Sequence, residues 1–224
     1  MRKLRGEILS LVLIVSAFAL SLALSSRLPQ QIPTSWNLRG QPTDFTPKPW
    51  GQFLIPLTMT GTYLLLLVLP GISPRGYRFE SFRGAWEIVR AAILAFLLFV
   101  HAVILLSAVG AGIATDRAME VGTGLLLVVL GNYMGKLTKN FFVGIRTPWT
   151  LASDEVWLRT HRLGGKLFLA AGLVLFAAGL TGLGFVPAVV AVGAAALVSV
   201  AYSYVLYRRL EGFKGEAPGQ HPAG

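Results

Sequence analysis

Six apolar runs constrain the fold of this chain more than any other feature of its sequence. They cover residues 8–24, 53–69, 88–108, 119–137, 167–183 and 186–207. A helix needs about 20 mostly apolar residues to cross the hydrocarbon core of a bilayer. Only 13% of the 224 residues are charged, whereas soluble domains carry about 25%. The sequence therefore predicts an all-α, polytopic membrane protein with six transmembrane helices, the fourth having the shortest apolar centre.

The basic residues are distributed unevenly between the two sides that six spans would create. Lys and Arg number 15 in the two termini and the loops 71–87 and 135–166, and 4 in the loops 26–51 and 111–118. Loops rich in Lys and Arg stay in the cytoplasm. Both termini are therefore expected inside, and the net charge of +10 is read as this asymmetry, not as nucleic acid binding. The first run follows basic residues, as in a signal peptide, but it is long for one, and we expect an uncleaved helix.

The outer loop, residues 27–51, contains five prolines and two glycines. Proline fixes its own φ and favours extended conformations in the residue before it. This composition predicts a structured, non-helical segment with a turn at 37–40. Trp36 and Trp50 fit the headgroup level, where tryptophan is common, and an external cap or a contact with an extracellular ligand is the alternative.

The inner segment, residues 131–166, holds six basic residues, two tryptophans and a histidine. Pro148 excludes a continuous helix, and Ser153 with two acidic residues after it predicts a capped amphipathic helix that ends at Gly164-Gly165. On that helix Trp157 and His161 share a face. The segment could bind a partner, lie along the inner leaflet, or use Asn132, Asn140 and Thr147 to satisfy an irregular backbone. The sequence leaves these possibilities open.

Three stretches of this segment, 131–136 (GNYMGK), 140–151 (NFFVGIRTPWTL) and 156–166 (VWLRTHRLGGK), resemble the signature of the SdpI family. The outer loop resembles the DUF1648 domain at 28–29, 32–33, 36–37, 40–42 and Lys48. Ser35 departs from that pattern, which often has histidine there, and makes a titrating or metal-binding role of the loop doubtful. Together the resemblances predict a DUF1648-like region (1–70), a central part (71–118), an SdpI-like region (119–207) and a disordered tail (208–224).

The resemblance implies a multi-pass protein of the bacterial inner membrane that confers immunity to a peptide toxin outside. It also implies that a cytoplasmic repressor-type protein is held at the membrane when toxin is present. The candidates for partner binding or for a structural signature are Asn132, Tyr133, Gly135, Lys136, Asn140, Gly144, Arg146, Thr147, Pro148, Trp149, Trp157, Thr160, His161 and Gly165. In the outer loop the candidates are Pro33, Trp36, Asn37, Gly40 and Pro42. The preferred partner contacts are Arg146, Trp149, Trp157 and His161.

The rival interpretation is a small-solute or ion transporter or channel. His101 lies about 20 Å along the third predicted helix at 1.5 Å per residue, and an ionisable group at that depth is a functional candidate. A neutral histidine bonded to a neighbouring helix is the alternative. The spans show neither the acids nor the paired charges of an ion-coupled carrier. No paired carboxylates or zinc motif point to an enzyme, and we expect no cofactor, metal or direct contact with nucleic acid.

Overall fold

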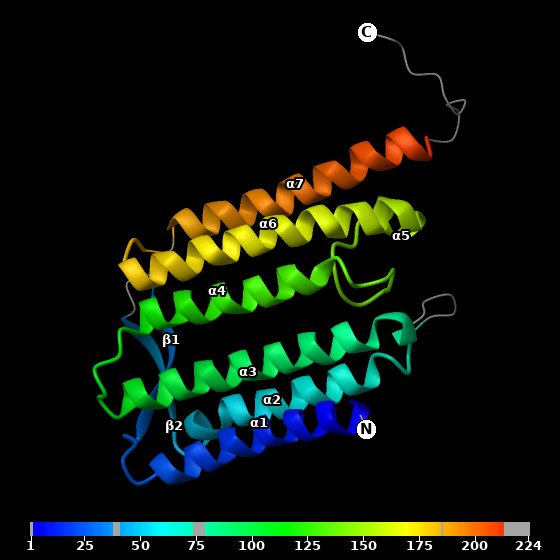
Figure 1. Ribbon diagram of the computed structural model, residues 1–224. Coiled ribbons are helices and arrows are strands. Elements are labelled where there is room, and N and C mark those ends of the chain that lie inside the picture. Colours follow the sequence, from blue (N-terminus) through cyan, green and yellow to red (C-terminus); the bar gives the residue numbers. More distant parts are fainter. Residues whose placement is uncertain (1, 38–40, 74–78, 185, 213–224) are drawn as a thin grey trace.

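The computed structural model describes residues 2–37, 41–73, 79–184 and 186–212. Six long helices lie side by side in a row, with a β hairpin across one end (Figure 1). The long helices are α1 (Arg2–Leu24), α2 (Trp50–Val68), α3 (Arg83–Ala108), α4 (Thr115–Met134), α6 (Asp154–Thr181) and α7 (Val186–Leu210). A 3₁₀ turn, η1 (Phe79–Phe82), precedes α3, and the short α5 (Pro148–Ala152) precedes α6. Of the predicted disordered tail, 208–224, residues 208–210 belong to α7, and residues 213–224 lie outside the described residues, as does Gly40.

Helices α1, α2 and α3 form a group, and α4, α6 and α7 continue from it in a row. Helices α1, α2 and α3 contact one another, α3 contacts α4, α4 contacts α6, and α6 contacts α7. We call the side with the hairpin the hairpin end and the opposite side, with α5 and the loop 135–147, the loop end. Helix α1 begins and α7 finishes at the loop end (Figure 1). The row therefore places the two terminal helices with their outer ends on the same side.

Five of these helices, all except α4, are long and apolar enough to cross a membrane. Their outward faces carry large apolar side chains, for example Val15, Val190 and Leu197, which are 64%, 64% and 73% exposed. Such exposure is suited to lipid and costly in water. The prediction of an all-α polytopic membrane protein is confirmed in this form. The sixth span stays a prediction, because α4 begins with charged residues and contains three glycines between 122 and 131.

The outer loop forms an antiparallel hairpin of β1 (Gln31–Trp36) and β2 (Pro42–Pro47), which the sequence analysis did not predict. Its tip is closed by Asn37, whose backbone N–H donates to Gln41 O at 2.9 Å and whose Oδ1 accepts from Gln41 N at 3.0 Å. Ile32 is fully buried and packs with Leu28, Ile104 and Leu105. The hairpin is thus seated on the ends of the helices. Two strands alone are marginally stable in water, and this packing supplies what they lack.

The predicted break at Gly164-Gly165 is wrong, because α6 runs without interruption from Asp154 to Thr181. The capped amphipathic helix and the fifth span are one element. Ser153 does cap it, with its side chain accepting from Val156 N at 3.4 Å. A Cβ on Gly165 would lie 2.6 Å from the carbonyl oxygen of Gly131 on α4. The glycine therefore allows two helices to touch instead of ending one.

Candidate functional site

The loop between α4 and α5 is held by side chains that satisfy its backbone. Asn140 is fully buried, and its Oδ1 accepts from the backbone N–H groups of Phe142 at 3.0 Å and Val143 at 2.7 Å. Its Nδ2 donates to Thr138 O at 3.0 Å. Asparagine often organises turns in this manner. Its position fits the structural role that the sequence left open.

The short helix α5 is built on a reciprocal cap. Thr147 Oγ1 accepts from Thr150 N at 3.1 Å, and Thr150 Oγ1 accepts from Thr147 N at 2.9 Å. Pro148 occupies the first turn, where a missing N–H costs little. Thr147 Oγ1 also lies 3.0 Å from Ser203 Oγ of α7. The cap therefore fixes α5 against the last helix.

Trp157 and His161 are stacked inside the protein, with ring centres 3.9 Å apart. The indole N–H of Trp157 donates to Leu137 O at 2.7 Å, while His161 Nε2 accepts from Ile145 N at 2.9 Å. His161 Nδ1 lies 2.8 Å from Trp157 O and therefore carries the proton as a donor. Trp157 is 1% exposed and His161 is not exposed. These contacts fasten the loop to α6 and leave neither side chain free to touch a soluble partner.

Glycine is required beside this histidine. Gly144 has φ +117°, a conformation that side chains rarely adopt, and a Cβ there would collide with His161 Nε2. Gly135 is looser, since a Cβ would meet Arg162 Cγ at 3.5 Å. Thr160 is buried, and its hydroxyl has no hydrogen-bond partner among the described residues.

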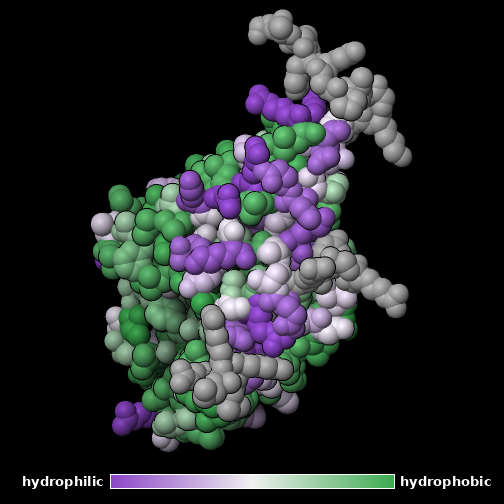
Figure 2. All heavy atoms as spheres, turned by 45° about the vertical axis from the view of Figure 1, so that its right-hand side comes forward, coloured by the Kyte–Doolittle hydropathy of each residue, from purple (hydrophilic) through white to green (hydrophobic). Residues whose placement is uncertain are grey.

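The remaining candidates of this segment lie at the surface. Arg146 is exposed and donates to Phe141 O at 2.6 Å. Lys136 lies over the ring of Tyr133, 4.3 Å from its centre, and Trp149 meets Tyr204 of α7 edge-on at 5.0 Å. Asn132, Pro148, Arg159, Arg162 and Lys166 are also exposed at this end, as are the acidic residues Asp154 and Glu155. Hydrophilic side chains gather on this face of the molecule (Figure 2).

His101 is part of a buried polar cluster between α1, α2 and α3. Its Nε2 lies 2.9 Å from Ser21 Oγ and 3.2 Å from Ala17 O. Ser21 Oγ also donates to Gln52 O at 2.7 Å, so His101 Nε2 is the donor to Ser21. This geometry fits the alternative of a neutral histidine bonded to a neighbouring helix. The bonds join α1, α2 and α3.

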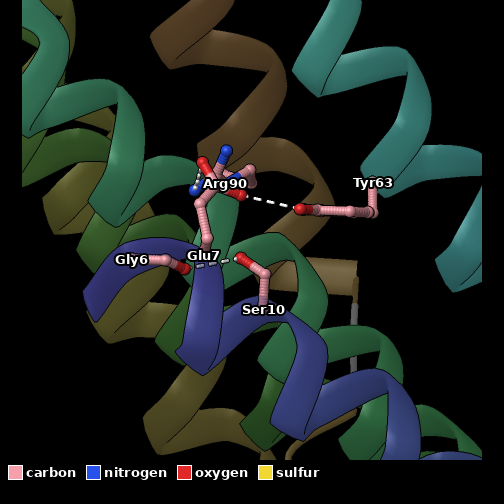
Figure 3. A network of polar contacts seen from close by, with 5 residues as sticks. All are labelled: Gly6, Glu7, Ser10, Tyr63 and Arg90. Carbon is pink, nitrogen blue, oxygen red and sulfur yellow. Dashed lines mark hydrogen bonds and ion pairs between the residues drawn. The ribbon is translucent and has the colours of Figure 1, made fainter. Parts of the chain in front are cut away.

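A second polar cluster, which the sequence analysis missed, lies in the loop-end half of α1, α2 and α3 (Figure 3). Arg90 is 3% exposed, and its Nη2 lies 3.0 Å from Glu7 Oε1. Glu7 Oε2 accepts from the hydroxyl of Tyr63 at 2.7 Å. Glu120 of α4 is also buried, at 9% exposure. The expectation that the helices contain neither acids nor paired charges is therefore wrong. Glu7 comes directly before the apolar run 8–24, and Arg90 lies near the start of the run 88–108. These positions were the signal in the sequence for a charged pair.

The outer-loop candidates divide between support and surface. Pro33 is buried and Trp36 half-buried in the hairpin's contact with the helices, whereas Asn37 and Pro42 are exposed. Lys48, next to β2, donates to the carbonyl oxygens of Ser25 and, at 2.8 Å, Leu28.

A glycine-lined contact between α4 and α6 was also missed. Cβ atoms added at Gly124 or Gly131 would lie 2.5–2.8 Å from backbone atoms of α6, and one at Gly172 would lie 2.8 Å from Gly124 O. The glycines recur every seven residues, at 124 and 131 on α4 and at 165, 172 and 179 on α6. Seven residues make about two helical turns, so each set forms one stripe. That spacing was the readable signal.

Comparison with known proteins relates both ends of the molecule to one group. Residues 136–203 match the model of the SdpI/YfhL protein family, and residues 12–60 match a domain of unknown function, DUF1648. The chain is 28% identical over 172 residues, 77% of its length and 80% of the relative's, to Immunity protein SdpI of Bacillus subtilis (strain 168). No solved structure matches. These matches include most of the loop-end signature and the hairpin, and together they relate the chain to the SdpI family.

Proposed function

We propose that this protein is a bacterial membrane immunity protein that protects its cell from a membrane-active peptide. The observation that carries the proposal is its similarity to an immunity protein over 77% of the chain. The two family matches cover residues 12–60, most of the α1–hairpin–α2 unit, and residues 136–203, which contain α5, α6 and most of α7. The five apolar helices agree with a site of action in the membrane.

In this proposal the protein crosses the membrane six times, with the hairpin end outside and the loop end in the cytoplasm. Helix α4 has 20 residues, about 30 Å at 1.5 Å per residue, which matches the hydrocarbon core. It packs between α3 and α6, both apolar enough to cross. The excess of Lys and Arg at the loop end supports the direction.

The chain has no cysteine, so single cysteines can report this topology directly. Thr43→Cys on the hairpin should react with a membrane-impermeant maleimide in intact cells. Arg162→Cys at the loop end should react only after lysis. Both residues are exposed, so accessibility within the protein is matched, and the cysteine-free parent is the control. Labelling of Arg162→Cys in intact cells would contradict the orientation.

The two ends would have different tasks. A toxin from outside meets the hairpin end first, whereas the loop end offers exposed basic side chains to a cytoplasmic repressor-type protein. Of the four preferred contacts, Arg146 is exposed and Trp149 is half-buried, but Trp157 and His161 are buried. We therefore assign partner contact to Arg146 with Lys136, and support of the loop to Trp157 and His161.

A protection assay tests the proposal. The chain is expressed in a Bacillus subtilis strain that lacks its own immunity protein, and survival under peptide toxin is measured beside a toxin-responsive reporter. Wild type should protect, and an empty vector should not. Arg146→Ala should protect equally but lose reporter induction, because its side chain lies at the surface. Absence of protection by well-expressed wild type would refute immunity to that toxin, and equal reporter induction by both would refute the role of Arg146.

A further inference from the structure

A groove opens between α4 and α7 in the half of the protein nearer the hairpin. In the described part of the chain these two helices do not pack on each other, since both pack on α6. The groove has a volume of about 650 Å³ and is lined by Leu127, Leu175, Ala188, Val189, Val192 and Gly193, among others. This volume is typical of ligand sites. Asn37 of the hairpin also borders it, so the groove reaches the hairpin end.

The buried carboxylate in this lining has an oxygen without a hydrogen-bond partner among the described residues. Glu120 lines the groove, is only 9% exposed, and its Oε2 has no hydrogen-bond partner among the described residues. Burying an ionised carboxylate without a partner is costly. Proteins retain such groups when a ligand supplies the partner or when the group has another function.

Among the described residues Arg117 acts on Glu120 electrostatically but is not bonded to it. Within those residues no Lys, Arg or His nitrogen forms an ion pair with Glu120. The nearest basic neighbour on α4, Arg117, directs its guanidinium to Gly182, at the end of α6. Asp116 also borders the groove and is exposed. The mouth therefore adds a second negative charge, which favours approach of a cation.

We propose that this groove binds a peptide that has an apolar face and a positive charge, with Glu120 as the counter-ion and the wall of α7 against the apolar face. The inference rests on the proposed immunity function, for which it names the site and the chemistry of the toxin segment. The positive group, a lysine, an arginine or an amino terminus, would pair with Glu120. Apolar side chains of the peptide would cover Val189 and Val192.

Binding of designed peptides to the purified full-length protein in lipid nanodiscs tests this site. Three fluorescent 20-residue Leu/Ala peptides are compared, identical except for one position near the end, which is Lys, Leu or Glu. Wild type should bind the Lys peptide most tightly. Glu120→Gln keeps the shape of the side chain and should weaken binding of the Lys peptide by about 30-fold or more, the lower end of the range for removing one partner of a buried charge pair. Binding of the Leu peptide should change little.

Two further variants keep the test decisive. Asp44→Asn removes an exposed acid on the hairpin, away from the groove lining, and should bind as wild type does. Gly193→Leu fills the groove, and a Cβ there meets no atom within 4 Å, so the fold is kept. This variant should weaken the binding of every peptide that binds to wild type. Thermal unfolding of each variant checks that it is folded.

Three outcomes would overturn the inference: equal binding of the three peptides by wild type, equal binding of the Lys peptide by wild type and Glu120→Gln, or no binding at all. Equal binding would describe an apolar groove that accepts lipid chains or any hydrophobic segment. The survival assay separates this failure from failure of the proposed function. If wild type and Glu120→Gln protect cells equally, the proposed immunity function is kept and the groove has no part in it.

Discussion

The contact between α4 and α6 depends on the absence of a side chain at Gly131, and Gly131→Ala should weaken it. The added Cβ would lie 2.6 Å from Leu169 N and 2.7 Å from Gly165 O, both backbone atoms, whereas ordinary contact begins at 3.4 Å. Backbone of a packed helix cannot turn aside, so the two helices must move apart. Overpacking of this kind costs about 1–3 kcal/mol, and separation also loses contacts along the whole stripe.

The same substitution at Gly193 provides the matched control. Gly193 also lies inside a helix, α7, but a Cβ there meets nothing within 4 Å. Alanine is favoured over glycine in a helix by about 1 kcal/mol, and this gain applies at both sites. We therefore expect Gly193→Ala to be neutral or stabilising by up to about 1 kcal/mol, and Gly131→Ala to be destabilising by up to about 2 kcal/mol after the gain is subtracted.

Unfolding in mixed micelles with increasing SDS, followed by far-UV circular dichroism, measures the difference. The free energy of unfolding should fall for Gly131→Ala and stay level or rise for Gly193→Ala. If the two variants shift in the same direction by similar amounts, helix propensity alone governs both sites. The claim that α4 and α6 touch through their backbones would then be refuted.

Three further predictions follow from the polar contacts. Trp157→Phe keeps an aromatic ring but loses the five-membered ring whose N–H donates to Leu137 O at 2.7 Å, and should cost at least about 1–2 kcal/mol in the same unfolding assay, because the hydrogen bond is lost and a buried space opens. Trp50→Phe, at a residue 66% exposed, should change little, and equal losses would contradict the contact. Glu7→Gln leaves Arg90 buried without its ion pair and should cost up to about 3 kcal/mol, whereas retention of full stability would show that the pair does not form. Thr34→Cys with Thr46→Cys should form a disulfide within one chain on mild oxidation, since the two hydroxyls are 3.1 Å apart across the hairpin. Disulfide-linked dimers without the bond within one chain would argue against that register.

Most of the helical framework was predictable from apolar patterning. Most of the long helices begin within a few residues of the predicted apolar runs. Helices α1 and α6 begin well before theirs. Hydrophobicity marks the part of a helix that packs against lipid or core. Helix α6 begins about three turns before its apolar run, in a mainly polar segment. Glycines 164 and 165 were read as a stop signal because the sequence cannot tell a helix end from a close helix contact.

The candidate site was predictable in composition and less so in role. For Asn140 and Thr147 the sequence left open whether they satisfy the backbone or bind a partner, and their hydrogen bonds fit the first role. Trp157 and His161 were correctly placed on one helix face, but that face turns inward onto the loop 135–147. Periodicity defines which residues share a face and does not say what lies opposite.

The sequence by itself determined the membrane class, the number and approximate position of the long helices and the charge asymmetry between the two ends, because each depends on local composition. Tertiary structure decided which polar groups are buried together. Glu7 meets Arg90 across 83 residues, and Glu120 lies in a groove made with α6 and α7. Such neighbours are set by the packing of helices distant in sequence, which for α4 and α6 runs through their glycine stripes.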